Sequence, residues 1–124
     1  MNDKTYDSHR EGTAGRADVA DTPELLAYYR QLEALDVEGA WQQVAVPTLV
    51  VWGDYDWIMG RDESERAVAI LRAKDPALVT YEVRPKMNHH FDVFPDAAAA
   101  FHESGGKYDD GAADVMVRWL RRLI

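Results

Sequence analysis

The fold class is decided by the stretch Val46-Pro47-Thr48-Leu49-Val50-Val51-Trp52-Gly53-Asp54-Tyr55-Asp56. Its middle part is a run of β-branched and apolar residues bounded by Pro47 and Gly53, which predicts a strand buried on both faces, as in parallel sheets covered by helices. The run ends in Gly-x-x-Asp, and open α/β folds place their ligands at the carboxyl ends of parallel strands. Asp56 is therefore a candidate functional residue by position as well as by type.

The sequence after this strand predicts a helix and a second strand. Residues 62–74 carry apolar side chains at helical spacing, Asp62 and Glu65 have the spacing of a capping box, and Asp75-Pro76 ends the pattern. Residues 78–83 alternate between apolar and polar types and predict a strand. Strand, helix and strand together predict a βαβ unit with parallel strands, and hence an α/β fold.

Three further helices are expected around this unit. Thr22-Pro23 has the composition of a helix start, with an apolar stripe behind it, and a shorter helix is expected to end before Pro47. The last helix begins near Asp110, a plausible N-cap. Residues 1–21 contain almost no bulky aliphatic side chain, so we expect a disordered leader followed by one folded domain in residues 22–124.

Composition excludes several classes of protein. The sequence contains no apolar run of roughly 7–15 residues near its start, as a signal peptide needs, and no apolar run of roughly 20 residues, as a bilayer crossing needs. We therefore expect a cytoplasmic protein without a membrane partner. Cysteine is absent, which excludes disulfides and thiolate nucleophiles. The net charge of −8 argues against a nucleic-acid partner, because phosphate contacts need clustered Lys and Arg.

A histidine loop, residues 86–92, follows the second strand and is expected at the same sheet edge as Asp56. A carboxylate that holds an imidazole in one tautomer lets the ring carry a proton during nucleophilic catalysis. His89 is the candidate base, with His90 as the alternative, and Asp54 is the alternative acid. A metal site from His89, His90, Asp92 and His102 has no recognisable ligand spacing, so neither a metal nor another cofactor is expected.

Combined, these elements resemble the C-terminal portion of the α/β-hydrolase fold: a proline-led strand ending in Gly-x-x-Asp, a helix, a strand, a histidine loop and a terminal helix. The triad of that family follows the order serine, acid, histidine. The resemblance covers roughly residues 41–124 and implies that Asp56 is the catalytic acid and His89 the general base. The family's histidine is often followed by one residue and then Phe, here Phe91. The implied substrate is a small molecule with an ester, amide or related acyl bond.

The chain departs from the family because it has no Gly-x-Ser-x-Gly nucleophile motif. Its three serines, Ser8, Ser64 and Ser104, do not lie in a strand-to-helix turn that would expose a nucleophile. We therefore expect a truncated α/β-hydrolase fold, inactive alone, with an open strand edge that favours self-association or pairing with a partner. The alternatives are a subunit completed by a second chain that carries the nucleophile, and a non-catalytic interaction module.

Overall fold

The structure is a computed structural model, and it describes residues 22–124. The predicted leader, residues 1–21, lies outside this range. In chain order the elements are α2 (Pro23–Glu33), α3 (Val37–Gln43), β1 (Thr48–Gly53), α4 (Arg61–Lys74), a 3-10 turn (Pro76–Leu78), β2 (Val79–Arg84), β3 (Asp92–Val93), α5 (Ala97–Phe101), β4 (Lys107–Tyr108) and α6 (Asp110–Leu120).

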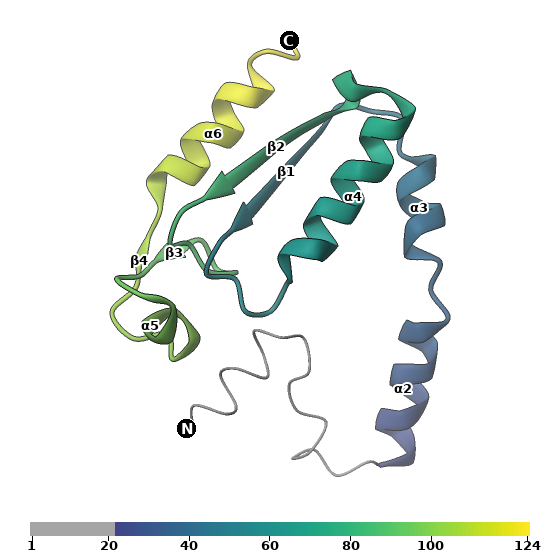
Figure 1. The fold of residues 1–124 in the computed structure, drawn as a ribbon, viewed down its shortest axis with the longest axis horizontal. Helices are drawn as coiled ribbons and strands as arrows, with labels where there is room; N and C mark the ends of the chain where they lie inside the picture. The colour runs from purple at the N-terminus through teal and green to yellow at the C-terminus, as the bar shows by residue number, and fades with distance from the viewer. Residues whose placement is uncertain (1–21) are drawn as a thin grey trace.

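The predicted βαβ unit forms the centre of the molecule. Strands β1 and β2 pair in parallel, from Thr48 opposite Val79 to Gly53 opposite Arg84, and α4 connects them. Helices α4 and α6 lie on opposite faces of this two-stranded sheet, and α3 packs beside α4 (Figure 1). The chain is thus a mixed α/β protein with a small parallel sheet. The carboxyl ends of both strands lie at the same end of the sheet, where the histidine loop begins.

The hydrophobic core lies between α4 and the sheet. Val68, Leu71 and Val79 are its buried members, and half-buried side chains from α3, the segment after it and both strands pack against them: Trp41, Val44, Val50 and Tyr81. Each buried aliphatic side chain contributes about 1.5–3 kcal/mol by leaving water. At the surface of this layer Glu38 accepts two hydrogen bonds from Arg66, at 2.6 and 2.8 Å, and these bonds lower the pKa of the Glu38 carboxyl.

The prediction that β1 is buried on both faces was wrong. Only Trp52 and Gly53 are buried, while the four preceding residues of β1 are half-buried. The reason is that the sheet has only two strands, so in residues 22–124 the other edge of β1 has no strand beside it. Helix α2 has no buried residue.

No helix within residues 22–124 combines the length and the apolar character that a membrane crossing requires.

Two predicted helix caps lie elsewhere. The backbone N–H of Gly60 donates to Glu63, so the pair predicted at Asp62 and Glu65 is wrong, and Glu65 instead pairs with Arg61. Helix α6 is capped by Asp109, whose carboxylate accepts from Gly111 N–H at 2.9 Å, and not by Asp110.

Arg84 at the end of β2 joins the sheet to the start of α6. Its guanidinium donates two hydrogen bonds, at 2.8 and 3.0 Å, to the carboxylate of Asp109, which raises the pKa of Arg84. The backbone N–H of Asp109 donates in turn to the carbonyl of Phe91 at 2.8 Å. The end of β2, the histidine loop and the start of α6 therefore hold one another in place.

Candidate active site

Asp56 and His89 meet beyond the carboxyl ends of the two parallel strands. The distance between His89 Nδ1 and Asp56 Oδ2 is 2.9 Å, which is a hydrogen bond. The Asp56 side chain is 6% exposed, whereas the His89 side chain is 43% exposed. The carboxylate is thus buried behind the imidazole, and the imidazole faces outward.

The turn after β1 fixes the second carboxylate oxygen of Asp56. Asp56 Oδ1 accepts hydrogen bonds from the backbone N–H groups of Ile58 and Met59, each at 2.9 Å. The backbone N–H of Asp56 donates to Gly53 O at 3.0 Å, which closes the turn. Oδ1 is therefore occupied by the backbone, and Oδ2 is the oxygen presented to the histidine.

The acid loop and the histidine loop are tied together by main-chain contacts. Asp54 N–H donates to Arg84 O, and Tyr55 N–H donates to Met87 O, both at 3.0 Å. Gly53 allows this close approach, because a Cβ on that residue would lie 2.0 Å from Met87 O. This role of Gly53 was not predicted from the sequence, where the available signal was its position between the strand and Asp56.

The alternative residues have other partners. Asp54 accepts a hydrogen bond from the backbone N–H of Lys86, so it acts in the contact between the two loops. His90 Nε2 lies 3.2 Å from Glu103 Oε1, so His90 pairs with a different carboxylate from the one that His89 contacts. No group of three or more His, Asp or Glu side chains in residues 22–124 is arranged to hold a metal ion.

No serine in the described part of the chain is hydrogen-bonded to His89. The hydroxyl of Ser64 is buried in α4 and is hydrogen-bonded to Arg61 O at 2.9 Å and to the Tyr81 hydroxyl at 2.8 Å. Ser104 is exposed after α5, and its backbone N–H donates to Ala99 O. Ser8 lies outside the described residues. Residues 22–124 thus bring together an acid and a base without a hydroxyl nucleophile.

The geometry defines what the pair can do chemically. A carboxylate oxygen only accepts hydrogen bonds, so the Nδ1 atom of a neutral His89 must carry the proton for the 2.9 Å contact to form. The lone pair then lies on Nε2, and no residue in the range 22–124 occupies that nitrogen in a hydrogen bond or ion pair. His89 can accept a proton there, while Asp56 stabilises the resulting imidazolium.

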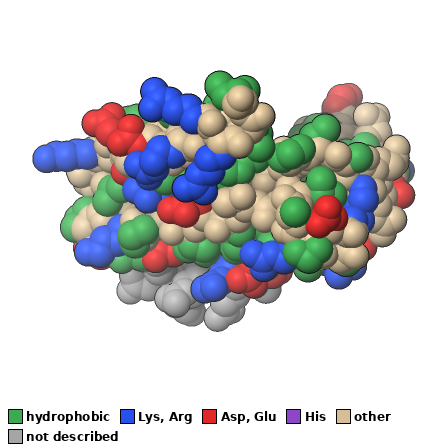
Figure 2. Space-filling model, turned by 90° about the horizontal axis from the view of Figure 1, so that it is seen from above, with side chains coloured by type: hydrophobic (Ala, Val, Ile, Leu, Met, Phe, Trp, Pro, Cys, Tyr) green, Lys and Arg blue, Asp and Glu red, His purple; other side chains and the backbone are tan. Residues whose placement is uncertain are grey.

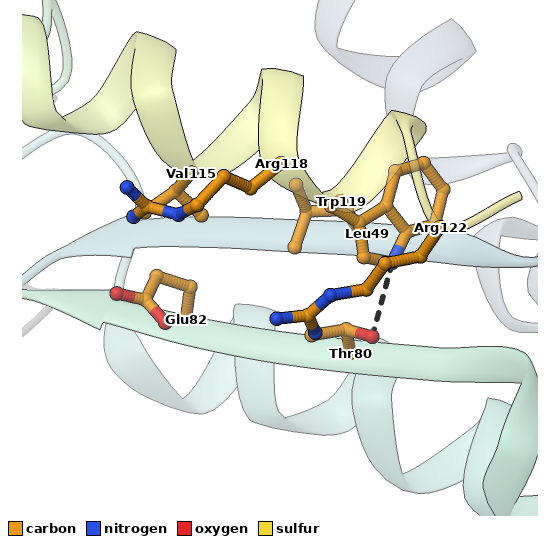
Figure 3. A pocket seen from close by; sticks show the side chains of 7 residues that line it. All are labelled: Leu49, Thr80, Glu82, Val115, Arg118, Trp119 and Arg122. Atoms are coloured by element: carbon orange, nitrogen blue, oxygen red, sulfur yellow. Dashed lines mark hydrogen bonds between the residues drawn. The ribbon is translucent and has the colours of Figure 1, made fainter.

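A separate shallow groove of about 140 Å³ lies between the sheet and α6 (Figure 3). Arg118 of α6 and Arg122, which follows the end of α6, reach over it, and Trp119 donates a hydrogen bond to Thr80 at its floor. Lys and Arg side chains gather around α6 in the view from above, and no histidine is visible on this face (Figure 2). Neither Asp56 nor His89 lines the groove, so it is not part of the acid–histidine site.

Comparison of the chain with protein-family models, with curated proteins and with solved structures finds no match.

Proposed function

We propose that Asp56 and His89 are the acid and the general base of a serine-hydrolase site of the α/β-hydrolase type, which cleaves ester, amide or related acyl bonds. The observation that carries the proposal is the 2.9 Å contact between His89 Nδ1 and the buried Asp56 carboxylate, with Nε2 turned outward. The order of strand, acid, helix, strand and histidine supports the same reaction class. The nucleophile is supplied from outside residues 1–124.

The proposed chemistry is a proton transfer by His89. Nε2 takes the proton of the nucleophilic hydroxyl as its oxygen bonds to the acyl carbon, and Asp56 stabilises the imidazolium through Nδ1. The same proton then passes to the leaving alcohol or amine as the acyl bond breaks. In the second half of the reaction His89 takes a proton from water as the water oxygen bonds to the acyl carbon. The bond between the acyl group and the nucleophile then breaks, the proton returns to the nucleophile's oxygen, and the carboxylic acid product is released.

The experiment is hydrolysis of a p-nitrophenyl acyl ester series by the full chain, alone and co-expressed with flanking reading frames that encode Gly-x-Ser-x-Gly. Alone, the chain is expected to give no turnover above buffer. In the completed assembly we expect turnover that falls about 10²–10⁴-fold in His89→Ala, because the general base is lost. His102→Ala is the matched control, since His102 is exposed in the cap after α5, and it should keep full activity.

Two results would contradict the proposal. Turnover in the completed assembly that survives His89→Ala would remove His89 from the chemistry and favour an interaction module. Turnover by the isolated chain that disappears in His89→Ala would place the nucleophile inside this chain or give that role to a water molecule activated by the pair.

We also propose that the open edge of β1 pairs with another polypeptide strand, from a second copy or from the polypeptide that carries the nucleophile. A strand edge leaves backbone N–H and C=O groups without partners, and such edges recruit further strands. The purified chain is therefore expected to sediment as an oligomer at micromolar concentration. A stable monomer over the whole concentration range would argue against pairing with a second copy.

A further inference from the structure

We propose that Asn88 is the positioning residue that aims His89 at Asp56, an inference that rests on the proposed function. Asn88 precedes His89 in the chain, and its side chain is one of the largest that is fully buried, in a residue that is 2% exposed. A buried polar side chain costs free energy unless it is hydrogen-bonded. The contacts of Asn88 identify what it holds.

Asn88 organises the whole turn that carries the histidine. Its side-chain Oδ1 accepts from the backbone N–H of His90 at 3.0 Å and from that of Asp92 at 3.1 Å. Its own N–H donates to Asp92 O at 2.9 Å, and its carbonyl accepts from Phe91 N–H at 3.2 Å. Four hydrogen bonds of one residue thus enclose the segment from His89 to Asp92.

This turn contains a conformation that needs such support. Phe91 has φ of 64°, in the left-handed region that side chains other than glycine rarely adopt. Holding a bulky residue there costs free energy and persists only when surrounding contacts determine it. Because Asn88 bonds the backbone on both sides of Phe91, it fixes the turn. His89 has no backbone hydrogen bond to another part of the described chain in this turn, so its direction follows from the turn itself.

The proposal predicts a spectroscopic change that a purely structural residue would not cause. In Asn88→Ala the turn loses its acceptor oxygen, and the neutral His89 ring should lose its preference for the proton on Nδ1 and approach the tautomer ratio of His102. Nitrogen-15 NMR of the imidazoles measures both rings in the same full-length sample. The matched control is Val79→Ala, which weakens the core at the far end of β2 and should leave the His89 tautomer unchanged.

Asn88→Asp keeps the inference testable if the alanine variant does not fold. It retains Oδ1 and replaces only Nδ2, which has no hydrogen-bond acceptor among residues 22–124. The aspartate variant is therefore expected to keep the Nδ1–H tautomer. A folded Asn88→Ala protein with an unchanged tautomer, or loss of the tautomer in Asn88→Asp, would overturn the positioning role. Because this readout needs no substrate, its failure is separate from a failure of His89-dependent hydrolysis.

Discussion

Alanine in place of Gly53 is expected to lower the free energy of unfolding by about 3 kcal/mol, the upper range for overpacking a closely packed contact. The added Cβ would lie 2.0 Å from the carbonyl oxygen of Met87, and a backbone atom cannot swing aside as a side chain can. Relief requires that the acid loop and the histidine loop separate, which also breaks the hydrogen bond from Tyr55 N–H to Met87 O. Urea denaturation followed by tryptophan fluorescence measures the loss.

Gly105→Ala is the matched control for this variant. Gly105 has φ of 77°, so alanine there is strained, but no heavy atom lies within 4 Å of the added Cβ. The expected loss is about 1 kcal/mol, the cost of left-handed backbone alone. Equal losses in the two variants would show that the close approach of Met87 O does not exclude a side chain at position 53.

Asparagine in place of Asp56 is expected to move the proton of the neutral His89 ring from Nδ1 to Nε2. The backbone N–H groups of Ile58 and Met59 hold Oδ1, so the asparagine carbonyl stays with them and its NH₂ group takes the place of Oδ2. An NH₂ group donates, which turns Nδ1 into an acceptor and leaves Nε2 protonated. In serine proteases the same tautomer change lowers kcat by about 10⁴-fold, and a comparable loss is expected in the completed enzyme.

The control for this variant is Asp54→Asn. It removes a nearby carboxylate of the same loop, while its Oδ1 still accepts from Lys86 N–H. The His89 tautomer should be unchanged. If both variants shifted the tautomer alike, the effect would come from the loss of charge and not from the contact between Asp56 and His89.

The sequence predicted the central unit of this fold because its signals are local. The apolar run of β1, the helical spacing of α4 and the alternation of β2 each lie within one element, and parallel pairing follows from their order. Antiparallel β3 and β4 were not predicted, because two-residue strands show no alternation. Burial of β1 was overestimated because an apolar run indicates a covered strand and says nothing of how many neighbours are present.

The predictions of the two helix caps were wrong for a different reason. Asp109 and Asp110 are equally good caps by type. In the structure Asp109 caps α6, and its carboxylate also binds Arg84, a contact between residues far apart in the sequence. At the start of α4 the side chain of Arg61 engages Glu65, which leaves Glu63 to accept from Gly60 N–H. Such competition between side chains is decided by tertiary contacts and by rotamers.

The candidate site was predicted in part. Topology placed an acid and a histidine at one sheet edge, and the structure brings Asp56 and His89 into contact there. The choice between His89 and His90 rested on resemblance, and their partners in the structure differ, Asp56 for His89 and Glu103 for His90. Asn88 was missed. Its signal was an asparagine in a loop, a residue type that hydrogen-bonds nearby backbone, but type alone does not show that the side chain is buried.

The most direct test of the central claim is the tautomer of His89 in the unmodified chain, measured by nitrogen-15 NMR at a pH where the ring is neutral. The account predicts that the proton resides on Nδ1, toward Asp56, with Nε2 unprotonated and available as a base. His102, which is exposed, serves as the reference in the same spectrum. A His89 ring protonated on Nε2, or with the same tautomer ratio as His102, would contradict the acid–base pair.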